Sequence, residues 1–279
     1  MSFSILNNIA SLDAQNQLNV NSVNLNNTLL RLSSGKRINS GADDPAGLGI
    51  ASTLKANALA LNQATQNANN GISVAQIADG ALSKISDLLT SGFSLAEEAA
   101  TDTTDSTGRT ALDSQLTSIK NEITRIATQT NFNGVNLFSA GGLNGTLHVF
   151  VGDTSAASSI SVTISTITAS SVGGVDISGT SLSTQNGAAS AMTSLKNALA
   201  GISTSRATIG AGINRLQSAV SVLQTTSENT TAAESNIEDA NMAQEISNMT
   251  KFQILAQTGI AALTQANSTA QNVLTLLKG

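Results

Sequence analysis

The chain has 279 residues, enough for one large domain or two modest ones, and its net charge of −5 without a long basic run argues against nucleic acid as a partner. Hydrophobic residues make up 40% of the chain but aromatic residues only 2%, so burial must come from Leu, Ile, Val and Ala, which suits helices packed on helices. The absence of Cys and the single His exclude disulfides, thiolate catalysis, zinc–thiolate sites and metal sites built on paired His.

The chain has no sequence feature that predicts membrane insertion or a cleaved leader. No run of about 18 apolar residues occurs, so no membrane-spanning helix is expected. Residues 1–21 lack the basic start and apolar core of a secretory signal peptide. If the protein leaves the cell, we expect export without a cleaved signal peptide.

The first predicted element is a helix over residues 4–32. Its apolar residues, among them Leu18, Leu25 and Leu29, recur in steps of three, four or seven, and Asn and Gln fill the other face. Residues 33–44 are predicted to be a non-helical break between this helix and the next. Asp44 before the only proline, Pro45, predicts a helix start, because Asp caps free amides and Pro at the first position loses no hydrogen bond.

Two more helices are predicted next. The second runs from Pro45 to about Ala100, with apolar residues at a mean spacing of about 3.5, the spacing of helices packed lengthwise. A turn rich in Thr and Asp at 101–110 precedes the third helix, whose apolar residues extend from Leu112 to Ile126.

The period changes between residues 131 and 187. Two runs alternate apolar and polar residues: Leu147, Val149 and Val151, then Ile160, Val162 and Ile164. The period of two predicts a β-hairpin with a loop at 153–158, and we expect that loop to tolerate insertion. The rest of the segment is rich in Gly, Ser and Thr and predicts short strands and turns.

Helical periodicity returns near Ala188 and continues to Leu223. Only Arg206 interrupts the apolar seam, and we interpret it as a side chain that snorkels at the edge of the stripe. A second polar break is predicted at 227–235. Chain ends that meet would put the terminal helices in one layer and the three central helices in another, with the β segment farthest from the termini.

The last helix is predicted from Asn236 to Leu277, with apolar residues every three or four positions and an almost uncharged Gln, Asn, Ser and Thr face opposite. Such a helix cannot bury its stripe alone, so it predicts partners on both sides, that is, assembly; the alternative is a long helix in a monomeric bundle. Because no charged side chains of the chain itself stabilise them, the terminal helices are expected to be disordered in the monomer and to order on assembly.

Residues that would carry chemistry have structural explanations. His148 lies in a predicted strand and is interpreted as structural, and Asp43 with Asp44 is interpreted as helix capping. The acidic residues Glu234, Glu238, Asp239 and Glu245 are expected to face Arg31, Lys36 and Arg37 across the two breaks. No catalytic, cofactor-binding or metal-binding residue is predicted, and the chain is not expected to be an enzyme.

Four segments of the sequence resemble the signatures of bacterial flagellins. They are Leu32 to Ala51 (LSSGKRINSGADDPAGLGIA), Thr130 to Leu137 (TNFNGVNL), Glu234 to Glu245 (ESNIEDANMAQE) and Gln265 to Leu274 (QANSTAQNVL). The resemblance covers roughly residues 1–138 and 190–279. Only about fifty residues lie between these two parts, so the chain resembles a short flagellin with a minimal central region.

The resemblance implies a mainly α fold: long antiparallel helices in a coiled-coil-like bundle, a small β-hairpin segment, and terminal helices paired in a separate inner layer. The implied domains are 1–44, an amino-terminal inner-tube helix with its break; 45–227, a central helical domain with the β segment at about 131–187; and 228–279, a break and carboxyl-terminal inner-tube helix. The implied function is a structural subunit that self-assembles into the extracellular flagellar filament used for swimming.

The implied partners are other copies in a helical filament, the flagellar export apparatus, a flagellin export chaperone, and hook-associated and filament-cap proteins. A hook–filament junction protein, which has similar chain ends, is the nearest alternative. A soluble coiled-coil signalling module is a further alternative, although its helices would normally carry flanking charges.

The residues assigned to the assembly stripe are Leu18, Leu25, Leu29, Met242, Ile246, Met249, Phe252, Ile260, Leu263, Val273 and Leu277. Flagellins seen by the innate-immune Toll-like receptor share a Gln-Arg-x-Arg-Glu-Leu motif in the second helix. Aligned on it, this chain has Ser91 and Phe93 in place of the two Arg, and only Leu95 matches. The resemblance therefore implies weak receptor recognition, with Phe93 expected to fill a pocket between subunits.

Overall fold

A computed structural model describes residues 8–278 except 140–141, 144, 153–158 and 169, and it describes only the backbone of residues 270–278. The predicted hairpin loop, with its expected tolerance of insertion, lies outside the described residues. The chain divides into two compact units: unit 1 is Met1–Ala56 with Asn229–Gly279, and unit 2 is Asn57–Glu228. Both boundaries lie within helices, and the three-domain division stays a prediction.

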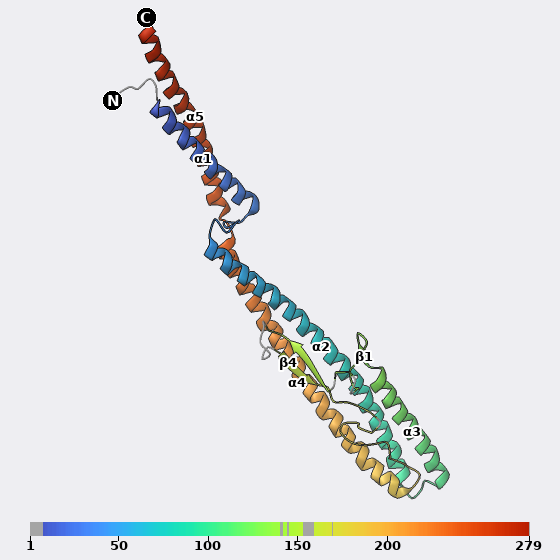
Figure 1. Ribbon diagram of the computed structural model, residues 1–279. Coiled ribbons are helices and arrows are strands. Elements are labelled where there is room, and N and C mark those ends of the chain that lie inside the picture. Colours follow the sequence, from blue (N-terminus) through green and yellow to red (C-terminus); the bar gives the residue numbers. More distant parts are fainter. Residues whose placement is uncertain (1–7, 140–141, 144, 153–158, 169, 279) are drawn as a thin grey trace. The chain divides into compact units, whose positions relative to one another are not determined.

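Unit 1 is built on two long helices that pack against each other, α1 (Ile9–Ser34) and α5 (Met242–Lys278) (Figure 1). The side chain of Asn8 caps α1 by accepting from the Ser11 amide at 3.1 Å. The same side chain donates to the carbonyl of Ala266 in α5 at 3.0 Å. The pairing of the terminal helices is therefore as predicted.

The core of unit 2 lies between α2 (Pro45–Ala100), α3 (Ser106–Gln129) and α4 (Gln185–Glu238). The predicted apolar stripes supply the fully buried side chains, which include Leu82, Ile85, Leu89, Leu116, Ile123, Leu195 and Ile202. The mainly α fold with long packed helices and a small hairpin is confirmed.

The predicted break at 227–235 is wrong, because α4 continues to Glu238. No Gly or Pro occurs between Ile213 and Asn241, so nothing in the backbone chemistry stops the helix there. Ser227 is also buried, and its hydroxyl donates to Asn62 Oδ1 in α2 at 3.1 Å. The polar residues that suggested a break are helical, and one of them, Ser227, forms a hydrogen bond between α4 and α2.

The described residues of unit 2 also contain four short strands in two antiparallel pairs. They are β1 (Asn131–Phe132) with β2 (Val135–Asn136), and β3 (Thr146–Phe150) with β4 (Ser159–Thr163). The second pair is the predicted hairpin, with Leu147 opposite Val162 and Val149 opposite Ile160.

Two glycines, one in α2 and one in α4, allow this hairpin to pack closely against the helices. A Cβ on Gly71 of α2 would lie 2.5 Å from a methyl of Val149, and one on Gly212 of α4 would lie 2.7 Å from a methyl of Val162. Real side chains do not approach so closely, so the two helices can touch β3 and β4 only because these positions lack a side chain.

The position of the hairpin within unit 2 differs from the prediction. It contacts α2 near Gly71 and α4 near Gly212, close to the end at which the chain enters and leaves unit 2. The turn between α2 and α3 lies at the other end. The prediction assumed that distance along the chain from the termini becomes distance in space, but the segment between α3 and α4 folds back along the helices.

Candidate assembly surfaces

Part of the predicted assembly stripe is used inside unit 1. Leu18 and Leu25 in α1 are half-buried, as are Met249, Phe252 and Leu263 in α5. A Cβ on Gly259 would lie 3.1 Å from Leu18 Cγ, so the glycine marks a close approach of the two helices. These residues form the seam between α1 and α5.

The rest of the stripe is exposed. Leu29, Met242, Ile246 and Ile260 are between 43% and 55% accessible. Further large apolar residues on the same helices are also exposed: Ile9, Leu12, Val20, Val23, Leu30, Ile254 and Leu255. Val273 and Leu277 lie among the residues whose side chains are not described. Two paired helices thus leave a long apolar face uncovered, and faces of this extent mark interaction sites.

Sequence reasoning treated the stripe as one surface because spacing alone gives one apolar side to each helix. A helix that packs against two partners needs two apolar sides, and only the packing of α1 on α5 shows which residue belongs to which side. Val20, Val23 and Ile254 were missed because they fall off the main stripe.

At one end of unit 1, a clasp joins the segment after α1 to the end of α4 and to the short connection before α5. The amide of Arg37 donates to the Glu238 carbonyl at 2.6 Å, and the amide of Ala240 donates to the Gly35 carbonyl at 2.9 Å. Lys36 Nζ lies 2.6 Å from Glu238 Oε1, and the Arg37 guanidinium donates to the Ile237 carbonyl at 2.6 Å. The predicted facing of acidic and basic residues is confirmed for Lys36 with Glu238 and for Arg31 with Glu245, whereas Arg37 contacts a carbonyl.

The charges in the clasp affect one another. The hydrogen bond to Glu238 raises the pKa of Lys36 above its ordinary value, and the charges of Glu238, Glu234 and Asp239 add to the rise against a smaller opposing effect of burial. Nearby, the amides of Ser40 and Asn39 donate to Asp43 and lower the pKa of its carboxyl. Asp43 therefore orders the connecting segment and does not cap a helix; the capping interpreted from sequence is confirmed for Asp44, whose Oδ1 accepts from the Gly47 amide of α2 at 2.9 Å.

Glu245 lies beside the clasp in the first turn of α5 and is buried. Its Oε1 is 3.8 Å from Arg31 Nη1 of α1, and its Oε2 has no hydrogen-bond partner among the described residues. The amino-terminal end of a helix favours a negative charge, which offsets part of the cost of burying this carboxylate.

The three residues of the predicted receptor-region surface differ in exposure. Ser91 is exposed, and its hydroxyl donates to the Asp87 carbonyl at 3.1 Å. Phe93 and Leu95 are half-buried and pack against the core of unit 2. Part of each remains available to a partner, so the pocket between subunits proposed for Phe93 stays a prediction.

Polar residues elsewhere have structural partners. Arg206 does not simply snorkel: its Nε lies 2.8 Å from Asp79 Oδ1 of α2. His148 Nδ1 lies 3.0 Å from the Ser161 hydroxyl across the hairpin, a structural role as interpreted from sequence. Among the described residues no group of three or more His, Cys, Asp or Glu is placed to hold a metal ion. Within the same part of the chain, no helix is long and apolar enough to cross a membrane.

Comparisons with known proteins agree with this arrangement. The bacterial flagellin N-terminal helical region matches residues 5–142, and the bacterial flagellin C-terminal helical region matches residues 180–277. The flagellar filament 30.7 kDa core protein of Treponema maltophilum is 35% identical, over 98% of this chain and 99% of that protein. A flagellin of Listeria innocua is 33% identical, over 97% of this chain and 98% of that protein.

A solved structure described as a flagellar hook-associated protein of Vibrio parahaemolyticus aligns with a TM-score of 0.57, covering 71% of this chain and 100% of that one. At 16% identity this likeness shows the fold alone and does not favour the hook–filament junction alternative. The family matches, by contrast, take in both helical regions and nearly the whole length of the filament proteins. The chain therefore belongs to the bacterial flagellins and is a structural subunit of the flagellar filament.

Proposed function

We propose that the uncovered apolar face of unit 1 is the surface through which copies of this flagellin polymerise. The observation that carries the proposal is the exposure of a row of large apolar side chains along α1 and α5, among them Leu12, Leu29, Ile246 and Ile260. Fully burying one such side chain contributes about 1.5–3 kcal/mol. Repeated along two helices, this burial offsets the entropy lost when a subunit is fixed in the polymer.

The test is a charge placed on the exposed face. Ile260→Asp should prevent seeded polymerisation, because a carboxylate would be buried between subunits without a partner. Gln265→Asp is the matched control: it puts the same charge on the same helix, five residues on and roughly 140° around the axis. Filament yield measured by sedimentation decides it, and normal yield from Ile260→Asp would reject the proposed face.

Leu263→Asp tests the seam between α1 and α5. Leu263 is half-buried where α1 packs on α5, so a carboxylate there should prevent polymerisation while unit 2 keeps its helical signal. Sedimentation measures the polymer, and circular dichroism of the monomer measures the helices of unit 2; normal filaments from this variant would show that the seam is not needed for assembly.

The same exposed face supports the proposed partners and location. A chain with a long uncovered apolar face needs cover before it assembles, which favours an export chaperone, and growth at the end of a filament favours contacts with cap and hook-associated proteins. We propose extracellular assembly after passage through the flagellar export apparatus. The role is mechanical and not catalytic.

Weak recognition by the innate-immune receptor is also proposed. Ser91 and Phe93 replace two Arg of the receptor-binding motif, and Arg is a frequent interface anchor because its planar fork makes several hydrogen bonds. In addition, part of the Phe93 side chain packs against the core of unit 2, so only the remainder can contact a receptor. A cell reporter assay with monomeric protein tests this: activation equal to that by an Arg-containing flagellin would contradict it.

A further inference from the structure

The turn between β1 and β2 contains one of the four Asn-Gly steps in the chain. The steps begin at Asn70, Asn133, Asn144 and Asn186, and the structure describes both residues of all but the third. In an Asn-Gly step the backbone amide of the second residue can attack the side-chain amide of the first, because Gly has no side chain to obstruct the approach. Whether the folded chain permits the attack depends on the freedom of each step.

Two of the described steps are held in helices. Gly71 is buried inside α2, where the helical backbone is fixed and its amide belongs to the helical hydrogen bonds. Gly187 lies in the first turn of α4, and its amide donates to the Thr184 hydroxyl at 3.1 Å. An amide that is fixed and hydrogen-bonded cannot turn toward the preceding side chain. We therefore expect little reaction at Asn70 and Asn186.

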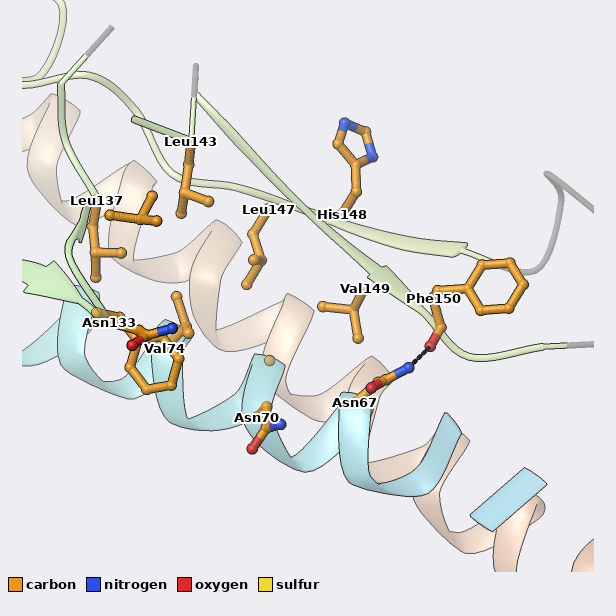
Figure 2. A pocket seen from close by; sticks show the side chains of 13 residues that line it. Asn67, Asn70, Val74, Asn133, Leu137, Leu143, Leu147, His148, Val149 and Phe150 are labelled. Atoms are coloured by element: carbon orange, nitrogen blue, oxygen red, sulfur yellow. Dashed lines mark hydrogen bonds between the residues drawn. The ribbon is translucent and has the colours of Figure 1, made fainter. Parts of the chain in front are cut away.

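The step at Asn133 is free in each of these respects. Asn133 and Gly134 are both exposed, and among the described residues neither the Asn133 side chain nor the Gly134 amide has a hydrogen-bond partner. A Cβ built on Gly134 would meet nothing within 4 Å. Figure 2 shows Asn133 among the residues that line an open groove of about 410 Å³, together with Val74 and Leu137. The side chain thus has solvent and space around it, as the attack requires.

The short strands on either side restrain the turn weakly. β1 and β2 have two residues each, and the φ of Asn133 is 50°, a conformation that is uncommon for residues with a side chain. The firm attachment lies beyond the turn: the Asn136 side chain donates to the Thr128 carbonyl at 2.6 Å and accepts from the Phe138 amide at 2.9 Å. The tip of this hairpin can therefore rotate while its base stays in place.

We propose that Asn133 is a site of spontaneous covalent modification in which water is the reactant. The Gly134 nitrogen loses its proton to solvent and bonds to Asn133 Cγ. The side-chain nitrogen takes up a proton and leaves as ammonia, so a five-membered succinimide ring forms. Water then adds across one of the two C–N bonds of the ring and yields aspartate or isoaspartate at position 133.

The modification should open the small hairpin. Isoaspartate routes the main chain through the former side chain and lengthens the two-residue turn by one carbon, so Phe132 and Val135 can no longer pair as they do in the unmodified chain. It also adds a carboxylate where the chain has no charged residue between Arg125 and Asp153. Phe132 and Val135 line the groove as well, so the groove should change as the protein ages.

Mass spectrometry of the whole protein tests the site. Wild-type monomer is incubated in mildly alkaline buffer made with ¹⁸O-labelled water, and its peptides are then sequenced. The label enters only residues that react during the incubation, so modification during digestion is not counted. The chain unfolded in urea gives the intrinsic rate of each step. Folding should slow the reaction of Asn70 and Asn186 at least tenfold and that of Asn133 less than threefold. If folding slows Asn133 as much as it slows Asn70, the proposal is overturned.

Asn133→Gly supplies the matched control, because Gly accepts a positive φ and keeps the turn but has no amide to react. Before incubation, hydrogen exchange over residues 131–136 should agree within threefold between wild type and variant. Once most of position 133 is converted, exchange should be at least tenfold faster in the wild type. Equal exchange at that stage would overturn the proposed opening of the hairpin. All of these measurements use the monomer, so their outcome does not depend on the polymerisation proposed above.

Discussion

Lys36 and Glu238 form the one side-chain ion pair in the clasp that the structure describes at hydrogen-bond distance. Because the folded pKa of Lys36 is raised, the pair contributes stability that is fully present below the unfolded pKa of Lys, about 10.4, and is lost as the pH rises through the higher folded value. The clasp should therefore be unaffected near neutral pH and weaken above about pH 10.

Lys36→Met tests this dependence. At neutral pH it should lower the stability of unit 1 in filaments by no more than about 1 kcal/mol, since the Lys36 side chain is well exposed and solvent screens the pair. The filament melting temperature is measured at pH 7 and pH 10.5, with Lys55→Met as a control outside the clasp. A difference from wild type that does not shrink at the higher pH would contradict the assignment.

The contrast between Arg31, Lys36 and Arg206 shows which polar contacts a sequence predicts. The clasp was predictable because opposite charges gather near the end of α1 and near the end of α4, and these two places meet once the terminal helices pair. The partner of Arg206, Asp79, lies on another long helix. Finding that pair requires the register of α4 against α2, and a periodic stripe permits several registers.

The hairpin of β3 and β4 depends on helix positions without side chains. Gly212→Ala should push Val162 away from α4 and destabilise unit 2 by about 1–3 kcal/mol, as overpacking does. Gly210→Ala is the matched control on the same helix, where a Cβ meets nothing within 4 Å. It should leave stability unchanged or raise it by up to about 1 kcal/mol, because Ala favours a helix over Gly.

Urea unfolding of the monomer, followed by circular dichroism, measures both variants. Equal effects of the two substitutions would show that α4 responds only to helix propensity and that the hairpin does not pack closely on it. Gly71→Ala provides an independent check from α2, where the obstructing residue is Val149.

At the scale of whole elements, periodicity was a reliable guide and composition was not. The helix over 45–100 was predicted closely because it carries a long stripe and a clear start signal, Asp44 before Pro45. The third helix was predicted from its stripe, but it begins at Ser106, inside the predicted turn at 101–110, because Asp105 caps it by accepting from the Gly108 amide. The false break at 227–235 came from composition, and the contact of Ser227 with Asn62 could not be known from one helix alone. The β1–β2 pair was predicted only as short strands and turns without bounds, although Asn133-Gly134, with φ of 50° and 80°, supplies the turn that such hairpins prefer.

At the scale of the molecule, the two units bury their apolar residues to different degrees. Unit 2 has a large core, with side chains such as Phe138, Leu89 and Ile202 almost fully buried. Among the residues described in unit 1, buried side chains are few, including Thr28, Ile38 and Glu245, while many large apolar residues are exposed. Unit 2 thus has the means to fold alone, whereas unit 1 needs neighbours. Sequence predicted the stripes of both units, and it led us to expect from the lack of charge that the terminal helices need assembly to order; it did not give the burial of each stripe.

The last prediction follows from that difference. The helices α1 and α5 should be largely disordered in the monomer and ordered in the filament, because their one seam buries too little apolar surface to offset the entropy of ordering two long helices. Hydrogen exchange of monomer and filament measures it. Residues 12–30 and 246–274 should exchange fast in the monomer and slowly in the filament, while residues 112–126 of α3 should be protected in both and serve as the internal control. Strong protection of both terminal segments in the monomer would show that α1 and α5 fold without neighbours, and the uncovered face would then be a docking surface on a preformed pair of helices.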